Sequence, residues 1–323
     1  MRQSGLNERL DHVFVPMFTP FAGPRGGVNE AQLRANVRYL VRQGIRILNP
    51  AGTTGEFWTL TPGEHQQVLA CVVEEAKALD PGVVVAAGIS TPNLSMTLDL
   101  ARFASECGAD LLQLMPTYCL PMAPGDVVSY YEVVSNEIDV PVMIYEMPTA
   151  SGVAFNCELL ERICETCPNV VALKTAAPLN APWEFERIAR RFNGRLCIFA
   201  ATGAYFSPFA YMTGVCGMTD TMANAVPEFG LTLHRLARAR DWEQMNRIYH
   251  DAFDVLEIEM IYGRAGLREI GNVCGLGLGA PRHPMTSVLS GDDRRDIQRR
   301  LENWSFARKV LASPVLAESD GQP

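Results

Sequence analysis

The chain has 323 residues, of which 48 % are apolar and 20 % charged, so it can build a sizeable core and is too apolar to be disordered throughout. Its 28 basic and 36 acidic residues give a net charge of −8, which excludes the basic footprint of a nucleic-acid or anionic-membrane binder. No run approaches the ~18 apolar residues of a membrane span, and the polar start MRQSGLNERLDH lacks the apolar centre of a signal peptide. We therefore expect a cytoplasmic protein.

The cysteines and histidines do not have the spacing of a metal site. Nine cysteines, an odd number, favour reduced thiols over a disulfide framework. Cys164 and Cys167 form a CxxC, but they end a predicted helix and no second CxxC completes a zinc set, so we interpret them as structural thiols. The five histidines have neither HxH nor HExxH spacing, and the sequence thus predicts no metal site.

Eight short apolar runs, rich in β-branched residues, recur along the chain with helical patterns between them. Seven of them lack polar/apolar alternation, which is typical of parallel strands buried on both faces. They predict an α/β fold, a (β/α)8 barrel over residues 1–225, followed by a C-terminal helical extension over residues 226–323. The runs span residues 12–18, 45–52, 83–90, 110–116, 141–148, 170–176, 195–202 and 214–221.

The segments between and after these runs carry helix signals. Asn29 with Gln32, and Thr61 with Glu64, have the spacing of a capping box, and Pro92 fits the first turn of a helix. In the extension the patterns predict helices over residues 226–240, 241–262, 264–274 and 292–312.

Lys174 is the strongest candidate for a reactive residue. Barrels of this kind build their active sites at the carboxyl ends of the strands, and Lys174 follows VVAL in a predicted core strand. It is one of three lysines among the 28 basic residues. Burial lowers the pKa of a lysine towards neutrality, which leaves a nucleophilic amine that condenses with a ketone to form a Schiff base. The alternative is a lysine that ends the strand and pairs with a carboxylate.

Other strand ends carry weaker candidates. The GTTG turn at 52–55 either binds a carboxylate through its backbone N–H groups or is an ordinary glycine turn capped by threonine. Tyr145 and Tyr118 are candidate proton carriers, although a tyrosine at a strand end more often serves packing. Glu56 is either a base or a buried partner of the turn. The GVCG segment at 214–217 has the glycines of a phosphate cradle but no basic neighbour.

Three motifs occur together in one order and spacing: GTTGE after the second strand, Y-x-x-P at the end of the fifth, and a lysine 29 residues after that tyrosine. In this combination the chain resembles the dihydrodipicolinate synthase / N-acetylneuraminate lyase family. The resemblance runs from Phe18-Thr19-Pro20 through the C-terminal helices. It implies a class I, Schiff-base-forming barrel enzyme that acts on pyruvate or another 2-oxo acid, and a homo-oligomer, a tetramer or a dimer.

The resemblance also implies roles for individual residues. Lys174 matches the Schiff-base lysine, and Tyr145 matches the tyrosine that shuttles protons. Thr53 and Thr54 match the turn that holds the 2-oxo acid carboxylate. Thr53 would complete a Thr/Tyr/Tyr relay with Tyr118, which matches a tyrosine that reaches towards a neighbouring subunit's site. The other residues expected to bind substrate are Gly52, Gly203, Asp220 and Thr221.

Two departures from the family pattern concern the substrate. Dihydrodipicolinate synthases carry an arginine two residues after the Y-x-x-P proline, where this chain has Ala150, so we do not expect a dihydrodipicolinate synthase proper. Sialic acid lyases carry acidic residues after the seventh strand, where residues 202–204 read Thr-Gly-Ala. With Glu146 and Asp220 as additional acids, the distal part of the pocket is expected to be neutral or acidic and to favour a hydroxylated or apolar aldehyde.

The sequence therefore predicts an aldolase-type lyase that joins pyruvate, or another 2-oxo acid, to an aldehyde or cleaves the adduct. Because the lysine imine serves as the electron sink, no metal or organic cofactor is expected. Three alternatives stay open. A dehydratase of the same family would act on a 2-oxo-3-deoxy sugar acid and release no aldehyde. An inactive barrel would bind a 2-oxo acid or a partner protein without turnover, and a phosphate-binding barrel enzyme would be inhibited by phosphate.

Overall fold

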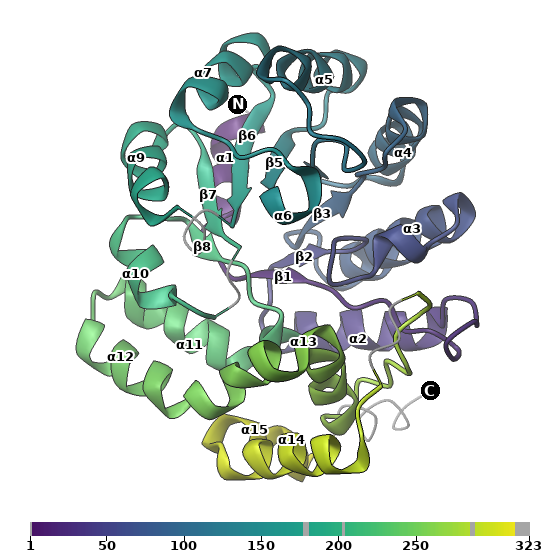
Figure 1. Cartoon of the computed structure of the whole chain (residues 1–323), viewed down its shortest axis with the longest axis vertical. Helices are drawn as coiled ribbons and strands as arrows, with labels where there is room; N and C mark the ends of the chain where they lie inside the picture. The colour runs from purple at the N-terminus through teal and green to yellow at the C-terminus, as the bar shows by residue number, and fades with distance from the viewer. Residues whose placement is uncertain (1, 177–180, 202–203, 285–287, 314–323) are drawn as a thin grey trace.

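The computed structural model describes residues 2–176, 181–201, 204–284 and 288–313, and its centre is a ring of eight parallel strands (Figure 1). Each strand pairs with the next from β1 to β8, and a parallel bridge between Phe14 and Thr219 joins the last strand to the first. The predicted (β/α)8 barrel is confirmed. The strands are β1 Phe14–Pro16, β2 Ile47–Asn49, β3 Val84–Gly88, β4 Leu111–Leu114, β5 Val142–Glu146, β6 Val170–Thr175, β7 Cys197–Ala200 and β8 Gly217–Met218.

Helices follow the strands and surround them (Figure 1). Thr61 and Glu64 form the complete capping box of α3, and Asn29 caps α2 through the Gln32 N–H group. The prediction for Pro92 is wrong: α4 begins two residues later, after an asparagine cap. The helices are α2 Glu30–Arg42, α3 Pro62–Leu79, α4 Leu94–Cys107, α5 Pro124–Glu137, the short α6 Pro148–Ser151, α7 Cys157–Thr166, α9 Pro182–Phe192, α10 Ser207–Met212 and α11 Pro227–Arg238.

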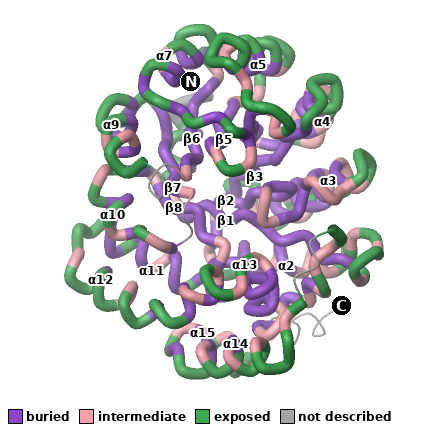
Figure 2. The backbone as a smooth tube through the Cα atoms, in the orientation of Figure 1, coloured by how far each residue is buried: buried purple, intermediate pink, exposed green. Residues whose placement is uncertain are grey.

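The strands are buried on both faces, and the exposed residues lie on the outer sides of the helices (Figure 2). One apolar cluster fills the barrel, and a larger one lies between the strands and the helices. The N-terminal helix α1 (Arg2–Arg9) adds Leu6 to the inner cluster, and Leu10 follows it. Because α1 precedes β1, these leucines close the amino end of the barrel and leave the carboxyl end for chemistry.

Four helices follow α11 and lie together beside the barrel (Figure 1). The helix predicted over 241–262 is divided at Ala252, and the break expected before 264 is a kink at Gly263, where φ is 59° and ψ is −146°. We propose residue 225, in the turn before α11, as the boundary between barrel and extension. The helices are α12 Trp242–Asp251, α13 Phe253–Val273, α14 Gly291–Asn303 and α15 Ser305–Ala312.

All nine cysteines are free, and Cys164 and Cys167 are buried at the end of α7. In the described ranges, no group of three histidine, cysteine or acidic side chains is placed to hold a metal ion. Of the helices in those ranges, none combines the length and apolar character needed to cross a membrane.

Candidate active site

The carboxyl ends of the strands open into a cavity of about 530 Å³. Its wall combines strand ends with the middle of α13. The structure brings together here Lys174, Tyr145, Thr53, Thr54 and Thr221, which the sequence singled out separately. Because they come from β6, β5, the turn after β2 and the end of β8, the closed barrel is what makes them neighbours.

Lys174 lies at the bottom of this cavity, with 3 % of its surface exposed. Its Nζ donates a hydrogen bond to Gln113 Oε1 at 3.2 Å and lies 4.2 Å from the centre of the Tyr145 ring. Among the described residues no carboxylate pairs with it, in contrast to the alternative of a strand-end ion pair. Burial, with a smaller repulsion from Arg264, lowers the pKa of Lys174 to about 7.

Tyr145 and Thr53 form a direct hydrogen bond in the same cavity. The Tyr145 hydroxyl and Thr53 Oγ1 are 2.8 Å apart, and either oxygen can donate. The Tyr145 hydroxyl also lies 3.1 Å from Met147 Sδ. Burial raises the pKa of Tyr145, although the Thr53 hydrogen bond partly offsets this effect. The phenol therefore keeps its proton at neutral pH and can pass it to a neighbouring atom.

The turn after β2 needs its glycines for close packing. A Cβ on Gly52 would lie 2.7 Å from Asn49 Oδ1, and one on Gly88 would lie 2.2 Å from the Ala51 carbonyl oxygen. Gly52 itself is not among the residues that line the cavity; its lack of a Cβ leaves room for Asn49, while Gly88 lets the turn approach β3.

The same turn presents donors to the cavity. The N–H groups of Gly55 and Glu56 bond to carbonyl oxygens within the turn, whereas the N–H groups of Thr53 and Thr54 have no partner among the described residues. The hydroxyls of Thr54 and Thr221 face each other at 3.4 Å. Two free N–H groups beside two hydroxyls can hold a small carboxylate.

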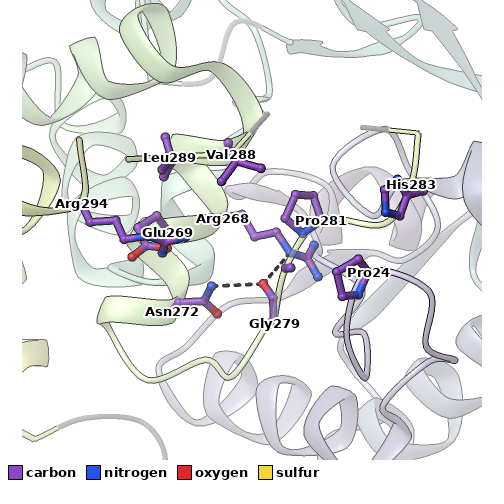
Figure 3. A pocket seen from close by; sticks show the side chains of 12 residues that line it. Pro24, Arg268, Glu269, Asn272, Gly279, Pro281, His283, Val288, Leu289 and Arg294 are labelled. Carbon is purple, nitrogen blue, oxygen red and sulfur yellow. Dashed lines mark hydrogen bonds and ion pairs between the residues drawn. The ribbon is translucent and has the colours of Figure 1, made fainter. Parts of the chain in front are cut away.

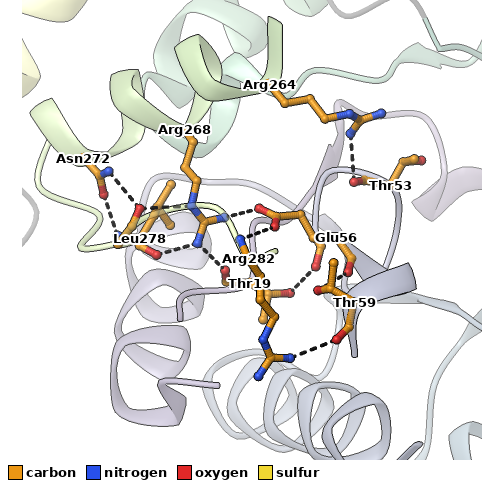
Figure 4. Close-up of polar contacts among 11 residues, drawn as sticks. Thr19, Thr53, Glu56, Thr59, Arg264, Arg268, Asn272, Leu278 and Arg282 are labelled. Atoms are coloured by element: carbon orange, nitrogen blue, oxygen red, sulfur yellow. Dashed lines mark hydrogen bonds and ion pairs between the residues drawn. The ribbon is translucent and has the colours of Figure 1, made fainter. Parts of the chain in front are cut away.

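Glu56 anchors this turn to α13 and to the segment that follows it (Figure 4). Its carboxylate accepts from Arg268 Nη1 at 2.7 Å and from the Arg282 N–H group at 2.9 Å. Arg268 also donates to the Thr19 and Gly279 carbonyl oxygens. Burial is the largest influence on the Glu56 pKa and raises it, whereas Arg268 acts in the opposite direction. Of the two interpretations left open, the buried partner fits these contacts.

Arg264 is a cavity residue that sequence reasoning missed. It follows the kink at Gly263, donates from Nη1 to the Thr53 carbonyl oxygen at 2.9 Å (Figure 4), and lies over the Trp58 ring. The sequence-based expectation of a neutral or acidic distal pocket did not include this guanidinium, which lines the cavity together with Glu56 and Glu259. The sequence signal, a glycine inside a helical pattern, marked the kink but not the arginine's position.

Tyr118 does not line the Lys174 cavity. It contacts Phe57 edge-to-face, with ring centres 5.8 Å apart, and lines a separate cavity of about 290 Å³ together with Trp58. Burial raises its pKa to about 12. Within the described part of this single chain, Tyr118 is not among the residues that line the cavity with Thr53 and Tyr145, and its expected place in a relay across subunits stays a prediction.

Asp220, which was expected to bind substrate, does not line the Lys174 cavity either. Thr219 and Thr221 line this cavity, and Asp220 lies between them just after β8. It is fully buried, accepts from the Met222 N–H group at 2.9 Å and faces Gly230 on α11. Burial raises its pKa to about 7. Gly203, the remaining predicted substrate contact, lies outside the described residues.

Glu146, the acid beside Tyr145, holds the segment that follows β5. Its carboxylate accepts from the Phe155 N–H group at 3.0 Å and from the Thr175 hydroxyl. The side chain is 2 % exposed, and burial raises its pKa. Glu146 therefore supports the strand ends from behind and does not line the cavity.

A further cavity of about 280 Å³ lies between α13 and the segment that follows it (Figure 3). Ala265 and Pro281 line both this cavity and the Lys174 cavity. In its wall, Asn272 Nδ2 and Arg268 Nε both donate to the Gly279 carbonyl oxygen at 3.1 Å. These contacts tie α13 to the loop that follows it, and so fix the helix that covers the active-site mouth.

Comparison with known proteins identifies the family of this chain. The model of the dihydrodipicolinate synthetase family matches residues 9–303. The chain belongs to this family. Among curated family members, the 4-hydroxy-tetrahydrodipicolinate synthase of Methanopyrus kandleri is 25 % identical over 90 % of this chain and 95 % of its own length. The enzyme of that name from Nitratidesulfovibrio vulgaris is 28 % identical over 93 % of this chain and 97 % of its own.

Solved structures agree with the fold. Dihydrodipicolinate synthase from Aquifex aeolicus superposes with a TM-score of 0.84 at 22 % identity, over 92 % of this chain and 98 % of that one. N-acetylneuraminate lyase from Fusobacterium nucleatum superposes with a TM-score of 0.83 at 21 % identity, over 92 % and 99 %. Members of the family with different names therefore share this architecture, and the substrate has to be argued from the cavity.

Proposed function

We propose that this family member is a class I, aldolase-type lyase that forms a Schiff base between Lys174 and pyruvate or another 2-oxo acid. The observation that carries the proposal is the buried Lys174 amine, whose pKa is lowered to about 7, in one cavity with the Tyr145–Thr53 hydrogen bond. A neutral amine is the form that attacks a carbonyl, and a pKa near the working pH suits repeated protonation.

In this mechanism the Lys174 amine attacks C2 of the 2-oxo acid, and loss of water gives a protonated imine. The imine draws electrons from C3, so the C3–C4 bond of an aldol adduct can break to release an aldehyde, or form in the reverse direction. Tyr145, bonded to Thr53, moves the proton between its phenol and the C4 hydroxyl. The N–H groups of Thr53 and Thr54 hold the 2-oxo acid carboxylate. No step needs a metal or an organic cofactor.

The substrate we propose is not that of the 4-hydroxy-tetrahydrodipicolinate synthases. Ala150 offers no cation at the position where the resemblance implies a substrate-binding arginine. We expect no product from pyruvate and L-aspartate β-semialdehyde under conditions in which pyruvate forms an imine. Formation of the synthase product would contradict this part of the proposal.

The assembly and the compartment follow from the family resemblance. We propose a cytoplasmic homo-oligomer, a tetramer or a dimer, in which Tyr118 faces a second copy of the chain. Sedimentation equilibrium would test the assembly: a mass near 35.5 kDa, that of one chain, would contradict it.

Product analysis tests the activity. The purified chain is incubated with pyruvate and a panel of aldehydes, and products are identified by mass spectrometry. We expect an aldol adduct with at least one aldehyde, and release of that aldehyde from the isolated adduct. Lys174→Met should abolish both reactions, while Arg102→Gln, at an exposed ion pair on α4, should leave them unchanged. Loss of water without aldehyde release would indicate a dehydratase instead.

A further inference from the structure

Arg264 gives the Lys174 cavity a second positive charge. Of the described residues that line this cavity, Lys174 and Arg264 carry the basic side chains. Arg264 comes from α13, directly after Gly263, whose φ of 59° and ψ of −146° only glycine adopts readily. This kink displaces the second half of α13 and sets the point from which Arg264 reaches the cavity mouth.

The guanidinium is held in place but not neutralised. Its Nη1 donates to the Thr53 carbonyl oxygen at 2.9 Å, and its Cζ lies 5.2 Å from the centre of the Trp58 ring. In the parts of the chain that the structure describes, no carboxylate lies within ion-pair distance of Arg264. Nearby Arg268 and Arg282, by contrast, pair with Glu56 and Glu64. Arg264 therefore keeps N–H donors for a ligand.

The acidic side chains among the described lining residues form no ion pair with Arg264. These acids are Glu56 and Glu259, and Glu56 is engaged by Arg268 and Arg282. Glu259 precedes the kink on α13; burial raises its pKa, while the charge of Arg264 acts in the opposite direction. The Arg264 guanidinium, beside the Thr53 carbonyl oxygen, thus keeps donors that face the cavity.

We infer that Arg264 binds a carboxylate at the far end of the substrate, so that this enzyme acts on 2-oxo acids with a second acidic group. A planar guanidinium matches a carboxylate through two parallel hydrogen bonds, and its fixed position over Trp58 lowers the cost of ordering it. The inference rests on the proposed function, because the other carboxylate is assigned to the Thr53–Thr54 turn and C2 to Lys174.

The test compares pairs of 2-oxo acids of equal chain length by borohydride trapping. Oxaloacetate, 2-oxoglutarate and 2-oxoadipate are set against 2-oxobutanoate, 2-oxopentanoate and 2-oxohexanoate, and the concentration that gives half-maximal adduct is measured. We expect at least one dicarboxylate to be favoured over its monocarboxylate by roughly 10- to 100-fold, the range of a charge-assisted hydrogen bond. Arg264→Gln should remove this ratio, Arg264→Lys should keep part of it, and Arg102→Gln should keep it fully.

The ratio of half-maximal concentrations within a pair separates binding of the second carboxylate from other roles of Arg264. A change in the reactivity of Lys174 or in the position of Thr53 weakens both members of a pair equally and leaves the ratio unchanged. No preference for any dicarboxylate, or an unchanged ratio in Arg264→Gln, would overturn the inference. Calorimetry of the same pairs with Lys174→Ala separates this inference from the proposed function. If Lys174→Ala binds the dicarboxylates selectively but borohydride traps no adduct on the unmodified chain, only the imine chemistry is contradicted.

Discussion

Lys174 and Tyr145 occupy matched positions on the adjacent strands β6 and β5, and the Lys174 Nζ lies 4.2 Å from the centre of the Tyr145 ring. The pairing register therefore sets both the amine and the phenol at the same level of the barrel. The ring covers the amine and contributes to its burial, while the hydroxyl reaches Thr53 on the far side. The proposed nucleophile and the proposed proton carrier are thus placed by the same pair of strands.

The first prediction concerns the pH dependence of imine formation. The pKa of Lys174 is lowered to about 7, so the amine is protonated and unreactive below this pH and neutral above it. The initial rate of borohydride trapping with pyruvate should rise with pH through a midpoint near 7. Arg264→Gln should move the midpoint upward, because the nearby cation opposes protonation of Lys174. A midpoint above 9 in the unmodified chain would contradict this account.

The second prediction separates proton transfer from imine formation. Tyr145→Phe and Thr53→Val each break the hydrogen bond between these two side chains. Aldol turnover should fall by about 10²- to 10³-fold, while trapping of pyruvate on Lys174 should persist. Tyr39→Phe removes a buried hydroxyl, which donates to the Ala225 carbonyl oxygen; neither residue lines the cavity, so this variant serves as the control. Equal losses in trapping and turnover would indicate that Tyr145 acts only by shaping the site.

Much of the fold, and the two side chains Lys174 and Tyr145 that share the candidate site, could be predicted from the sequence. Unbroken apolar runs at regular intervals marked the strands, and Lys174 was conspicuous as a cation in a core strand. Its cavity follows from the general rule that barrel active sites lie at the carboxyl ends of the strands. Arg264 could not be predicted, because its position depends on how α13 folds over the mouth, which no local pattern records.

Asp220 shows another limit. Which of the residues just after β8 face inward depends on how the barrel closes against Phe14, and a run of Thr-Asp-Thr is compatible with either face. The residue type of Asp220 was chemically suitable, but its direction is decided by long-range contacts. Tyr118, in the loop after β4, packs against Phe57, and its expected approach to a neighbouring subunit's site stays a prediction.

The third prediction concerns the buried ion pair of Glu56 and Arg268, whose side chains are 7 % and 2 % exposed. Glu56→Gln leaves the guanidinium without its counter-ion in the interior, which should lower the free energy of unfolding by about 3–5 kcal/mol. Glu243→Gln, at an exposed ion pair on α12, should change it by less than about 0.5 kcal/mol. Urea unfolding measures both, and a Glu56→Gln effect as small as that of the control would contradict a structural role.

The fourth prediction is that Lys174 lowers the free energy of unfolding of the chain. Its pKa falls from about 10.4 in the unfolded chain to about 7 in the folded one, so the penalty is complete below pH 7 and disappears above pH 10.4. Lys174→Met should therefore raise the free energy of unfolding by about 2–4 kcal/mol at pH 6.5, and by much less at pH 10. Unfolding curves of both proteins are measured at both pH values. Equal stability of the two proteins at pH 6.5 would contradict the prediction.

Borohydride reduction in the presence of pyruvate, read by intact mass and peptide mapping, tests most directly whether Lys174 forms a Schiff base. We expect one reduced pyruvate adduct per chain, on the peptide that contains Lys174, and no adduct in Lys174→Met. Lys77 and Lys309, both in ion pairs outside the cavity, are the internal controls and should stay unmodified. A folded chain that forms no adduct with pyruvate or any other 2-oxo acid, or forms it on another lysine, would contradict Schiff-base chemistry at Lys174.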